Sequence, residues 1–218
     1  MLGTYVLVVA GPGSIILSST LGLPSLETLS IVAATFGGTV ALVILAIGRI
    51  SGAHINPAIT IGSTLAGSFD SELALPYVVF QIAGAIMAGI FLRVCLGAIE
   101  PFAYLGSTKL ALGTTTIQGI VLEIIGTCVL TLSALVASSY VKTPLKQALL
   151  VGGTLAVLIL FIGPLTGASF NPARSLGPSL FSGYFTDQFV YYIGPVSGAV
   201  VAGLTFRQVR SSIGNGLE

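Results

Sequence analysis

The sequence predicts an all-α integral membrane protein that is built from an inverted repeat. Three observations support this fold class: a very apolar composition, apolar runs of membrane-spanning length, and an Asn-Pro-Ala phrase in each half of the chain. Hydrophobic residues make up 54% of the chain and charged residues only 7%, with a mean hydropathy of +1.04. Because about a quarter of the residues of soluble domains are charged, the chain is interpreted as a membrane protein.

The charge balance and the cysteines exclude several function classes. The chain has 8 lysine and arginine residues and 7 aspartate and glutamate residues. It therefore has no basic excess for nucleic-acid binding or for a polybasic membrane-surface role. Cys95 and Cys128 lie in apolar runs without metal or redox spacing, so no cofactor or metal is expected. The first stretch, MLGTYVLVVAGPGSIIL, lacks a charged start and a cleavage site, and we interpret it as a retained span.

Apolar runs define the predicted spans, since a spanning helix needs roughly 20 apolar residues. Six runs fit this length or nearly so: 2–20, 28–48, 73–98, 117–138, 146–162 and 188–208. Two shorter runs, 57–66 and 172–181, are each opened by an Asn-Pro pair whose proline is the first residue of the run. About ten helical residues cover about 15 Å, which is half of a hydrocarbon core roughly 30 Å thick. The two short runs are therefore predicted to be half-helices that together make one span.

Basic residues predict the orientation through the positive-inside rule. One side is expected to hold Arg49, Lys142, Lys146, Arg207 and Arg210. The other side is expected to hold Arg93, Lys109 and Arg174. The bias favours a multi-pass protein of the cell membrane with both termini in the cytoplasm.

The two halves of the chain resemble each other in sequence. GTYVL at 3–7 is similar to GTCVL at 126–130, and SGAHINPAIT at 51–60 is similar to TGASFNPARS at 166–175. Because each half holds three spans, an odd number, the second half must enter the membrane upside down. We expect one transmembrane domain over 1–218 with inverted repeats of about 1–110 and 111–218. The functional site of such repeats is expected near the membrane midplane.

Each residue of the phrases Asn56-Pro57-Ala58 and Asn171-Pro172-Ala173 suits the start of a helix. Asparagine is a preferred N-cap because its side-chain oxygen accepts a backbone N–H of the first turn. Proline fits the next position, where its missing N–H would have been unpaired, and alanine leaves room for two helix starts to approach. Asn-Pro also marks ordinary turns, but two copies in matching contexts argue against that reading.

The segments before the two phrases, SGAHI and TGASF, predict a lined passage. Non-helical backbone at membrane depth is tolerated only where it lines a cavity or is buried in protein. Its carbonyls would offer a series of acceptors, and the amides of Asn56 and Asn171 would offer donors at the centre. Each half-helix N-terminus carries about half a positive charge, which would exclude cations and protons but admit neutral solutes.

These residues resemble the aquaporin, or major intrinsic protein, channels, whose double Asn-Pro-Ala signature is specific. EIIGT at 123–127, FQIAGAI at 80–86 and IGPVSGA at 193–199 are also similar to family segments. The resemblance implies an aquaporin-like hourglass of six transmembrane helices plus two half-helices, commonly a homotetramer with one pore per subunit. It implies a passive channel for water, with small neutral solutes such as glycerol or dissolved gases as further candidates, and no enzyme activity.

The resemblance also implies a constriction outside the Asn-Pro-Ala level, formed by four residues. By family spacing these are Phe36, Ile159, Ala168 and Arg174. An arginine within the membrane costs about 2.5–3.5 kcal/mol on insertion scales, so a functional role for Arg174 is the default expectation.

Neighbouring residues favour water as the substrate. Ser175 follows Arg174 where the glycerol branch usually has aspartate, and Tyr191-Tyr192 is similar to the aromatic pair of the water branch. Strict water channels usually have histidine at the position of Ile159. This departure predicts a wider and more apolar constriction, and leakage of small neutral solutes or gases is a hypothesis.

Two further polar residues are predicted to support the half-helices. Glu123 is expected to accept backbone N–H groups of the second segment, because a polar residue in lipid must find partners; a proton relay is the less favoured alternative. His54 is expected to be a hydrogen-bonding residue of the first segment, although histidine titrates near neutrality and could act as a gate or pH sensor.

Other functions remain open from the sequence alone. A secondary transporter also uses inverted repeats and broken helices, but it would normally need ionisable groups at mid-membrane, where this chain offers only Glu123 and Arg174. An intramembrane enzyme is disfavoured because the chain lacks an H-E-x-x-H motif. A structural contact protein with a closed pore is the third alternative.

Overall fold

A computed structural model describes residues 1–96 and 104–215, and within them it contains helices but no strands. The helices are α1 (Leu2–Thr20), α2 (Ser25–Ser51), α3 (Pro57–Leu65), α4 (Ser71–Leu96), α5 (Thr116–Tyr140), α6 (Pro144–Thr166), α7 (Pro172–Ser182) and α8 (Val190–Asn215). Every predicted run corresponds to one of them, with ends that differ by up to seven residues. The last two residues of the run 73–98 lie outside the described residues.

The long helices have the length and composition of membrane spans. Among the described residues, α1, α2, α4, α5 and α6 are long and apolar enough to cross a membrane. The sixth predicted span, α8, has 26 residues, as α4 does, but it is less apolar because it holds Arg207, Arg210 and more glycine and serine residues than α4. Its assignment as a span therefore rests on its length and on its packing against α3 and α5.

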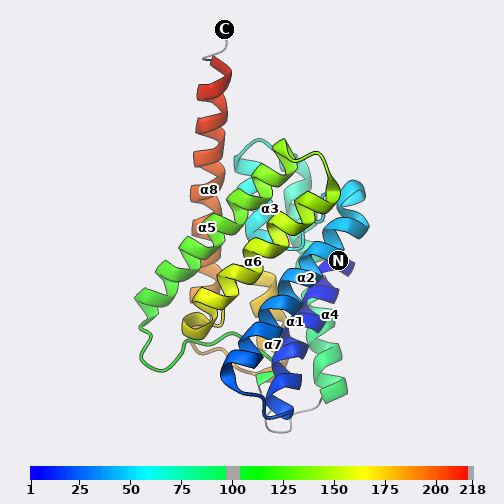
Figure 1. The fold of residues 1–218 in the computed structure, drawn as a ribbon, viewed down its shortest axis with the longest axis vertical. Coiled ribbons are helices and arrows are strands. Elements are labelled where there is room, and N and C mark those ends of the chain that lie inside the picture. Colours follow the sequence, from blue (N-terminus) through cyan, green and yellow to red (C-terminus); the bar gives the residue numbers. More distant parts are fainter. Residues whose placement is uncertain (97–103, 216–218) are drawn as a thin grey trace.

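The order of helices is the same in both halves of the chain: long, long, short, long. Helix α2 packs against α6, while α4 packs against α7 and α8 packs against α3. Each short helix is thus covered by a long helix of the other half. In Figure 1 the α5–α6 turn and the C-terminal ends of α2 and α8 lie at the same end of the bundle, and α7 lies toward the opposite end.

Glycines allow the close approach of the helices at two crossings. A Cβ at Gly37 of α2 would lie 2.5 Å from the carbonyl oxygen of Gly152 of α6, and one at Gly152 would lie 2.4 Å from that of Gly37. A Cβ at Gly177 of α7 would lie 2.3 Å from the carbonyl oxygen of Ala85 of α4. Small residues at such contacts are typical of membrane helices, which associate through close packing.

The distribution of apolar and charged side chains between surface and interior is reversed relative to a soluble protein. Large apolar side chains such as Leu42, Ile50 and Phe161 are exposed on the outside of the bundle, whereas Glu123 and Arg174 are buried within it. In lipid the exposed apolar side chains meet an apolar solvent, and buried charged groups face the bundle interior and mark functional sites. The interior between the two half-helices is therefore the place for the functional site.

Candidate functional site

The chain enters both half-helices by the same backbone route. Helix α2 is followed by Gly52 and Ala53 with φ of 68° and 52°, and α6 is followed by Gly167 and Ala168 with φ of 76° and 46°. Glycine adopts this left-handed conformation without a steric penalty, whereas an L-residue pays about 1–2 kcal/mol for it. The two left-handed residues end the long helix and turn the chain back toward the bundle centre. We call residues 52–55 and 167–170 the first and second lead-in.

Asparagine side chains cap both half-helices. The Asn56 Oδ1 atom accepts a hydrogen bond from the backbone N–H of Ala58 at 2.9 Å. The Asn171 Oδ1 atom accepts from the N–H groups of Ala173 at 3.0 Å and Arg174 at 3.3 Å. These bonds satisfy donors that a helix start leaves unpaired.

The same two asparagines join the half-helices to each other. The Asn56 Nδ2 atom donates to the carbonyl oxygen of Phe170 at 2.7 Å. The Asn171 Nδ2 atom donates to the carbonyl oxygen of Ile55 at 3.0 Å. The two helix N-termini therefore meet through a reciprocal pair of hydrogen bonds. Because a carboxamide NH₂ carries two hydrogens, each asparagine keeps a second donor for another partner.

Glu123 of α5 holds the second lead-in from behind. Its Oε1 atom accepts from the backbone N–H of Ser169 at 3.0 Å and from the hydroxyl of Thr166 at 2.8 Å. Its Oε2 atom accepts from the N–H of Phe170 at 2.8 Å, and the Tyr191 hydroxyl donates to the Thr166 carbonyl oxygen at 2.8 Å. A fully buried carboxylate thus supplies the acceptors that this non-helical backbone lacks.

Gln81 of α4 holds the first lead-in by donating hydrogen bonds instead of accepting them. Its Nε2 atom donates to the carbonyl oxygen of His54 at 2.7 Å and to the hydroxyl oxygen of Thr60 at 2.9 Å. The His54 Nδ1 atom lies 3.4 Å from the Thr60 hydroxyl oxygen. The His54 ring also packs against the Phe69 ring, with ring centroids 4.6 Å apart. The two lead-ins are therefore fixed by different chemistry despite their similar course.

Arg174, in the first turn of α7, is buried with 1% of its surface exposed. One terminal nitrogen, Nη1, donates to the carbonyl oxygen of Gly106 at 3.0 Å. The guanidinium carbon lies 5.0 Å from the centre of the Phe36 ring, within the range of a cation–π interaction. Among the described residues the Nε atom has no hydrogen-bond partner, so the guanidinium keeps donor capacity beyond its contact with Gly106.

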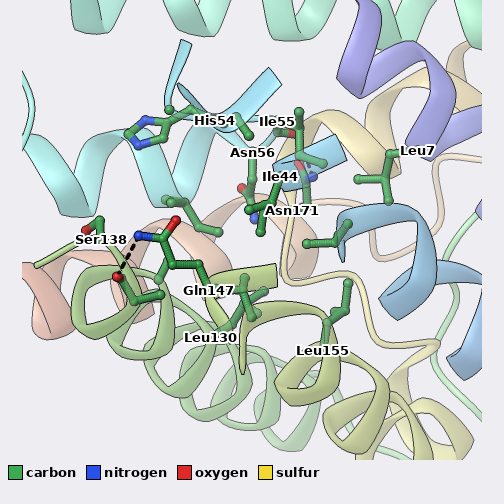
Figure 2. Close-up of a pocket in the computed structure, with 18 of the residues that line it drawn as sticks. Leu7, Ile44, His54, Ile55, Asn56, Leu130, Ser138, Gln147, Leu155 and Asn171 are labelled. Carbon is green, nitrogen blue, oxygen red and sulfur yellow. Dashed lines mark hydrogen bonds between the residues drawn. The ribbon is translucent and has the colours of Figure 1, made fainter. Parts of the chain in front are cut away.

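A cavity of about 360 Å³ runs past these groups. Six of the predicted residues line it: Phe36, His54, Asn56, Ala168, Asn171 and Arg174. Figure 2 shows Asn56 and Asn171 close together at the cavity, with Leu130 and Leu155 across from them. From Arg174 the lining extends to Arg49 near the end of α2 and to Gln147 near the start of α6. The site is thus a passage with polar groups along the lead-ins and apolar side chains opposite them.

Comparison with known proteins assigns the fold to a family. The family model described as Major intrinsic protein matches residues 1–206. The chain belongs to the major intrinsic protein family. Its relatives are aquaporins, which are passive channels and not enzymes, so this family member is a multi-pass membrane channel for water or small solutes.

Individual relatives of this major intrinsic protein cover nearly all of its chain. Aquaporin NIP1-2 of Oryza sativa subsp. japonica is 34% identical over 215 residues, covering 96% of this chain and 70% of the relative. Aquaporin NIP1-1 of Zea mays is 36% identical over 210 residues, covering 95% and 72%. The X-ray structure of the aquaglyceroporin from Plasmodium falciparum aligns with a TM-score of 0.78 and 26% identity, covering 99% of this chain and 94% of that chain.

Some predicted residues of this channel lie behind the cavity and do not line it. Ile159 is buried in an apolar cluster that also contains Phe36 and Ala168. Ala58 and Ala173 are fully buried at the helix starts, next to Pro57 and Pro172, which open α3 and α7. Glu123 accepts hydrogen bonds from the second lead-in but is absent from the cavity lining.

The structure adds lining residues that the sequence did not single out. On α2, Val40, Ile44 and Gly48 line the cavity, and on α6, Gln147, Val151 and Leu155 line it. Both sets follow the i, i+4 spacing of one helix face. That spacing was a visible signal, but it does not distinguish an apolar face that lines a pore from one that meets lipid. The carbonyl of Gly106 gave no sequence signal at all.

Proposed function

We propose that this channel conducts water as its main substrate, passes small neutral solutes such as glycerol or dissolved gases to a lesser extent, and excludes protons and ions. The observation that carries the proposal is the meeting of two half-helix N-termini beside the cavity, with Asn56 and Asn171 in its lining. A passage with this centre suits a neutral molecule that exchanges hydrogen bonds as it moves.

The proposed mechanism combines fixed donors with electrostatics. A water molecule at the centre would accept from the second N–H of each asparagine and donate to lead-in carbonyls. Each half-helix N-terminus contributes about half a positive charge at the same place, which opposes entry of a cation or proton. The apolar side chains opposite offer no alternative hydrogen bonds, so water would pass in a narrow file along the polar side.

We further propose that Phe36, Ile159, Ala168 and Arg174 form the selectivity filter. Support comes from the guanidinium of Arg174, which lies 5.0 Å from the centre of the Phe36 ring in the cavity lining. Ile159 is absent from the cavity lining and packs in the apolar cluster with Phe36 and Ala168. In this proposal it supports the filter from behind and offers no hydrogen-bonding group, which favours a tolerant filter. The similar structure from Plasmodium falciparum is an aquaglyceroporin, and that name supports testing glycerol beside water.

The assembly and orientation are also proposals. The shared end of α2, the α5–α6 turn and α8 carries Arg49, Lys146 and Arg207, which supports a cytoplasmic location of that end under the positive-inside rule. Broad exposure of apolar side chains on the outside of the bundle fits both lipid contact and a homotetramer with one pore per subunit.

The proposal is tested by light scattering from proteoliposomes under sucrose and glycerol gradients. Rapid shrinkage in sucrose, with slower but measurable entry of glycerol, is the expected result. Solute flux that saturates or that depends on an ion gradient would identify a coupled transporter instead. Shrinkage no faster than that of empty vesicles would overturn the proposed function.

Charge reversal at Arg174 is expected to abolish water conduction. A carboxylate in Arg174→Glu would lose the bond to the Gly106 carbonyl oxygen and the contact with the Phe36 ring. It would also place a negative charge where the proposed filter needs a donor. Phe36→Trp, which enlarges the ring beside the guanidinium, should lower conduction without changing the charge. The measurement is osmotic shrinkage per folded channel, and unchanged shrinkage in both variants would contradict the assigned constriction.

Mercurials are expected to leave the native channel conducting. Both cysteines lie outside the cavity lining: Cys95 is exposed near the end of α4, and Cys128 lies on α5. Ala168 lines the cavity, so Ala168→Cys should place a thiol in the pore and confer block by mercury that a thiol reductant reverses. Block of the native protein, or resistance of Ala168→Cys with its thiol accessible, would contradict the placement of Ala168.

A further inference from the structure

The α5–α6 turn borders the cavity at the end away from Arg174. Helix α5 ends at Tyr140 and α6 begins at Pro144, so residues 141–143 alone join the two helices. Ser138 of α5 and Pro144 and Gln147 of α6 all line the cavity. Residues on both sides of this turn therefore form part of the mouth of the cavity.

Gln147 ties the turn to the wall of the mouth. Its Nε2 atom donates to the carbonyl oxygen of Ala137 at 3.2 Å and to that of Val141 at 2.6 Å. The Val141 carbonyl oxygen, just past the end of α5, has no other donor among the described residues, whereas the Ala137 carbonyl oxygen also accepts from the Val141 backbone N–H at 3.2 Å. Both carbonyls lie at the negative end of the helix dipole, so an amide donor is favourable there. Figure 2 shows Gln147 beside Ser138, with its amide nitrogen in a hydrogen bond.

The two acceptors also fix which way the amide faces. The nitrogen and oxygen of a glutamine amide are hard to distinguish by shape, and the hydrogen-bond network decides between them. Both partners here are carbonyl oxygens, so only the NH₂ group can face them. The Oε1 atom accepts no hydrogen bond from the residues that the structure describes, whereas the amide nitrogen donates to both carbonyl oxygens.

We propose that Gln147 is a positioning residue that sets the aperture of the channel mouth by tying the α5–α6 turn back from the cavity through its two hydrogen bonds. The proposal rests on the proposed function, because an aperture matters only in a conducting channel. Without the two bonds, the Val141 carbonyl oxygen loses its only donor among the described residues, the Ala137 carbonyl oxygen keeps only its bond from the Val141 N–H, and residues 141–143 can move into the mouth of the cavity. Water entry, and not passage past the asparagines, then limits the rate.

The test compares water permeability per channel for the full-length chain in proteoliposomes. Gln147→Met removes both the hydrogen-bond donor and the acceptor of the side chain. Gln147→Glu keeps the shape of the side chain, but its carboxylate can only accept hydrogen bonds. Both should lower permeability about threefold or more, a change of the size expected for losing a net hydrogen bond, and should raise the activation energy of permeation. Gln147→Lys, which keeps a donor at the same place, should restore most of the permeability.

A matched control separates the mouth from general stability. Gln118 is also a glutamine that caps a helix: its Oε1 atom accepts from the Thr115 backbone N–H at 2.8 Å at the other end of α5, and it does not line this cavity. Gln118→Met should therefore conduct like the native channel. Native conduction in Gln147→Met and Gln147→Glu, or an equal loss in Gln118→Met, overturns the proposal. A native protein that does not conduct overturns the proposed function and this inference with it.

Discussion

Replacing Glu123 with leucine is expected to unfold the second lead-in and to abolish the channel. The substitution leaves three buried donors without their acceptor: the backbone N–H groups of Ser169 and Phe170 and the hydroxyl of Thr166. Each unsatisfied buried donor costs about 1–3 kcal/mol, so the sum is about 5 kcal/mol. For a chain of this size that corresponds to a fall in melting temperature of about 10–20 °C.

The loss can be measured as the fraction of detergent-solubilised protein that elutes as folded after stepwise heating. The thermal stability of Glu123→Gln should lie between those of the native protein and Glu123→Leu. The amide keeps one acceptor oxygen, but its NH₂ group faces the Phe170 N–H, so two donors oppose each other there. Glu27→Leu makes the same chemical change at an exposed position in the first turn of α2. The temperature at which this variant unfolds should stay near the native value. A Glu123→Leu protein with native stability and native water permeability would show that the second lead-in does not depend on this carboxylate.

Removing either central asparagine is expected to lower water permeability about tenfold, equivalent to about 1.4 kcal/mol in the barrier. Asn171→Leu deletes the cap of α7, the bond to the Ile55 carbonyl oxygen and the donor that faces the cavity. Asn56→Leu deletes the corresponding groups of α3, including the bond to the Phe170 carbonyl oxygen. Because these bonds are reciprocal, the effects of the two substitutions should not add in the double variant.

Aspartate at the same positions separates capping from donation. Asn56→Asp and Asn171→Asp keep an effective N-cap oxygen, but they lose the NH₂ donor and add negative charge beside the two positive helix ends. Folding should be retained, while water permeability falls and cation leakage rises. Permeability is measured by stopped-flow shrinkage and leakage by the decay of a preset ion gradient. Native water permeability and ion tightness in folded leucine and aspartate variants would contradict the proposed role of the asparagines.

Much of the fold was predictable because its signals are local. The long apolar runs indicate spans, and Asn-Pro predicts a helix start at Asn56 and Asn171, where α3 and α7 do begin one residue later. Capping depends on residues within one turn, so the sequence contains the information. The family assignment was likewise predictable from motifs and is confirmed by the match over residues 1–206.

The contacts that complete the site were not predictable, because they join residues far apart in the sequence. Nothing near Gly106 indicates that its carbonyl accepts from Arg174. The reciprocal bonds between the half-helices cross more than a hundred residues, and they appear only when both halves are packed. From the sequence alone, Gln147 is indistinguishable from any polar residue in the first turn of a helix. Its proposed positioning role depends on hydrogen bonds to carbonyl oxygens at the end of α5.

The most direct test of the central claim is a paired measurement of water and proton flux through the native protein in the same proteoliposomes. Two helix N-termini that meet beside a hydrated passage predict fast osmotic shrinkage together with a proton flux no greater than that of empty vesicles. Proton flux that rises in proportion to the water flux, or shrinkage at the rate of empty vesicles, would contradict a passage centred on Asn56 and Asn171.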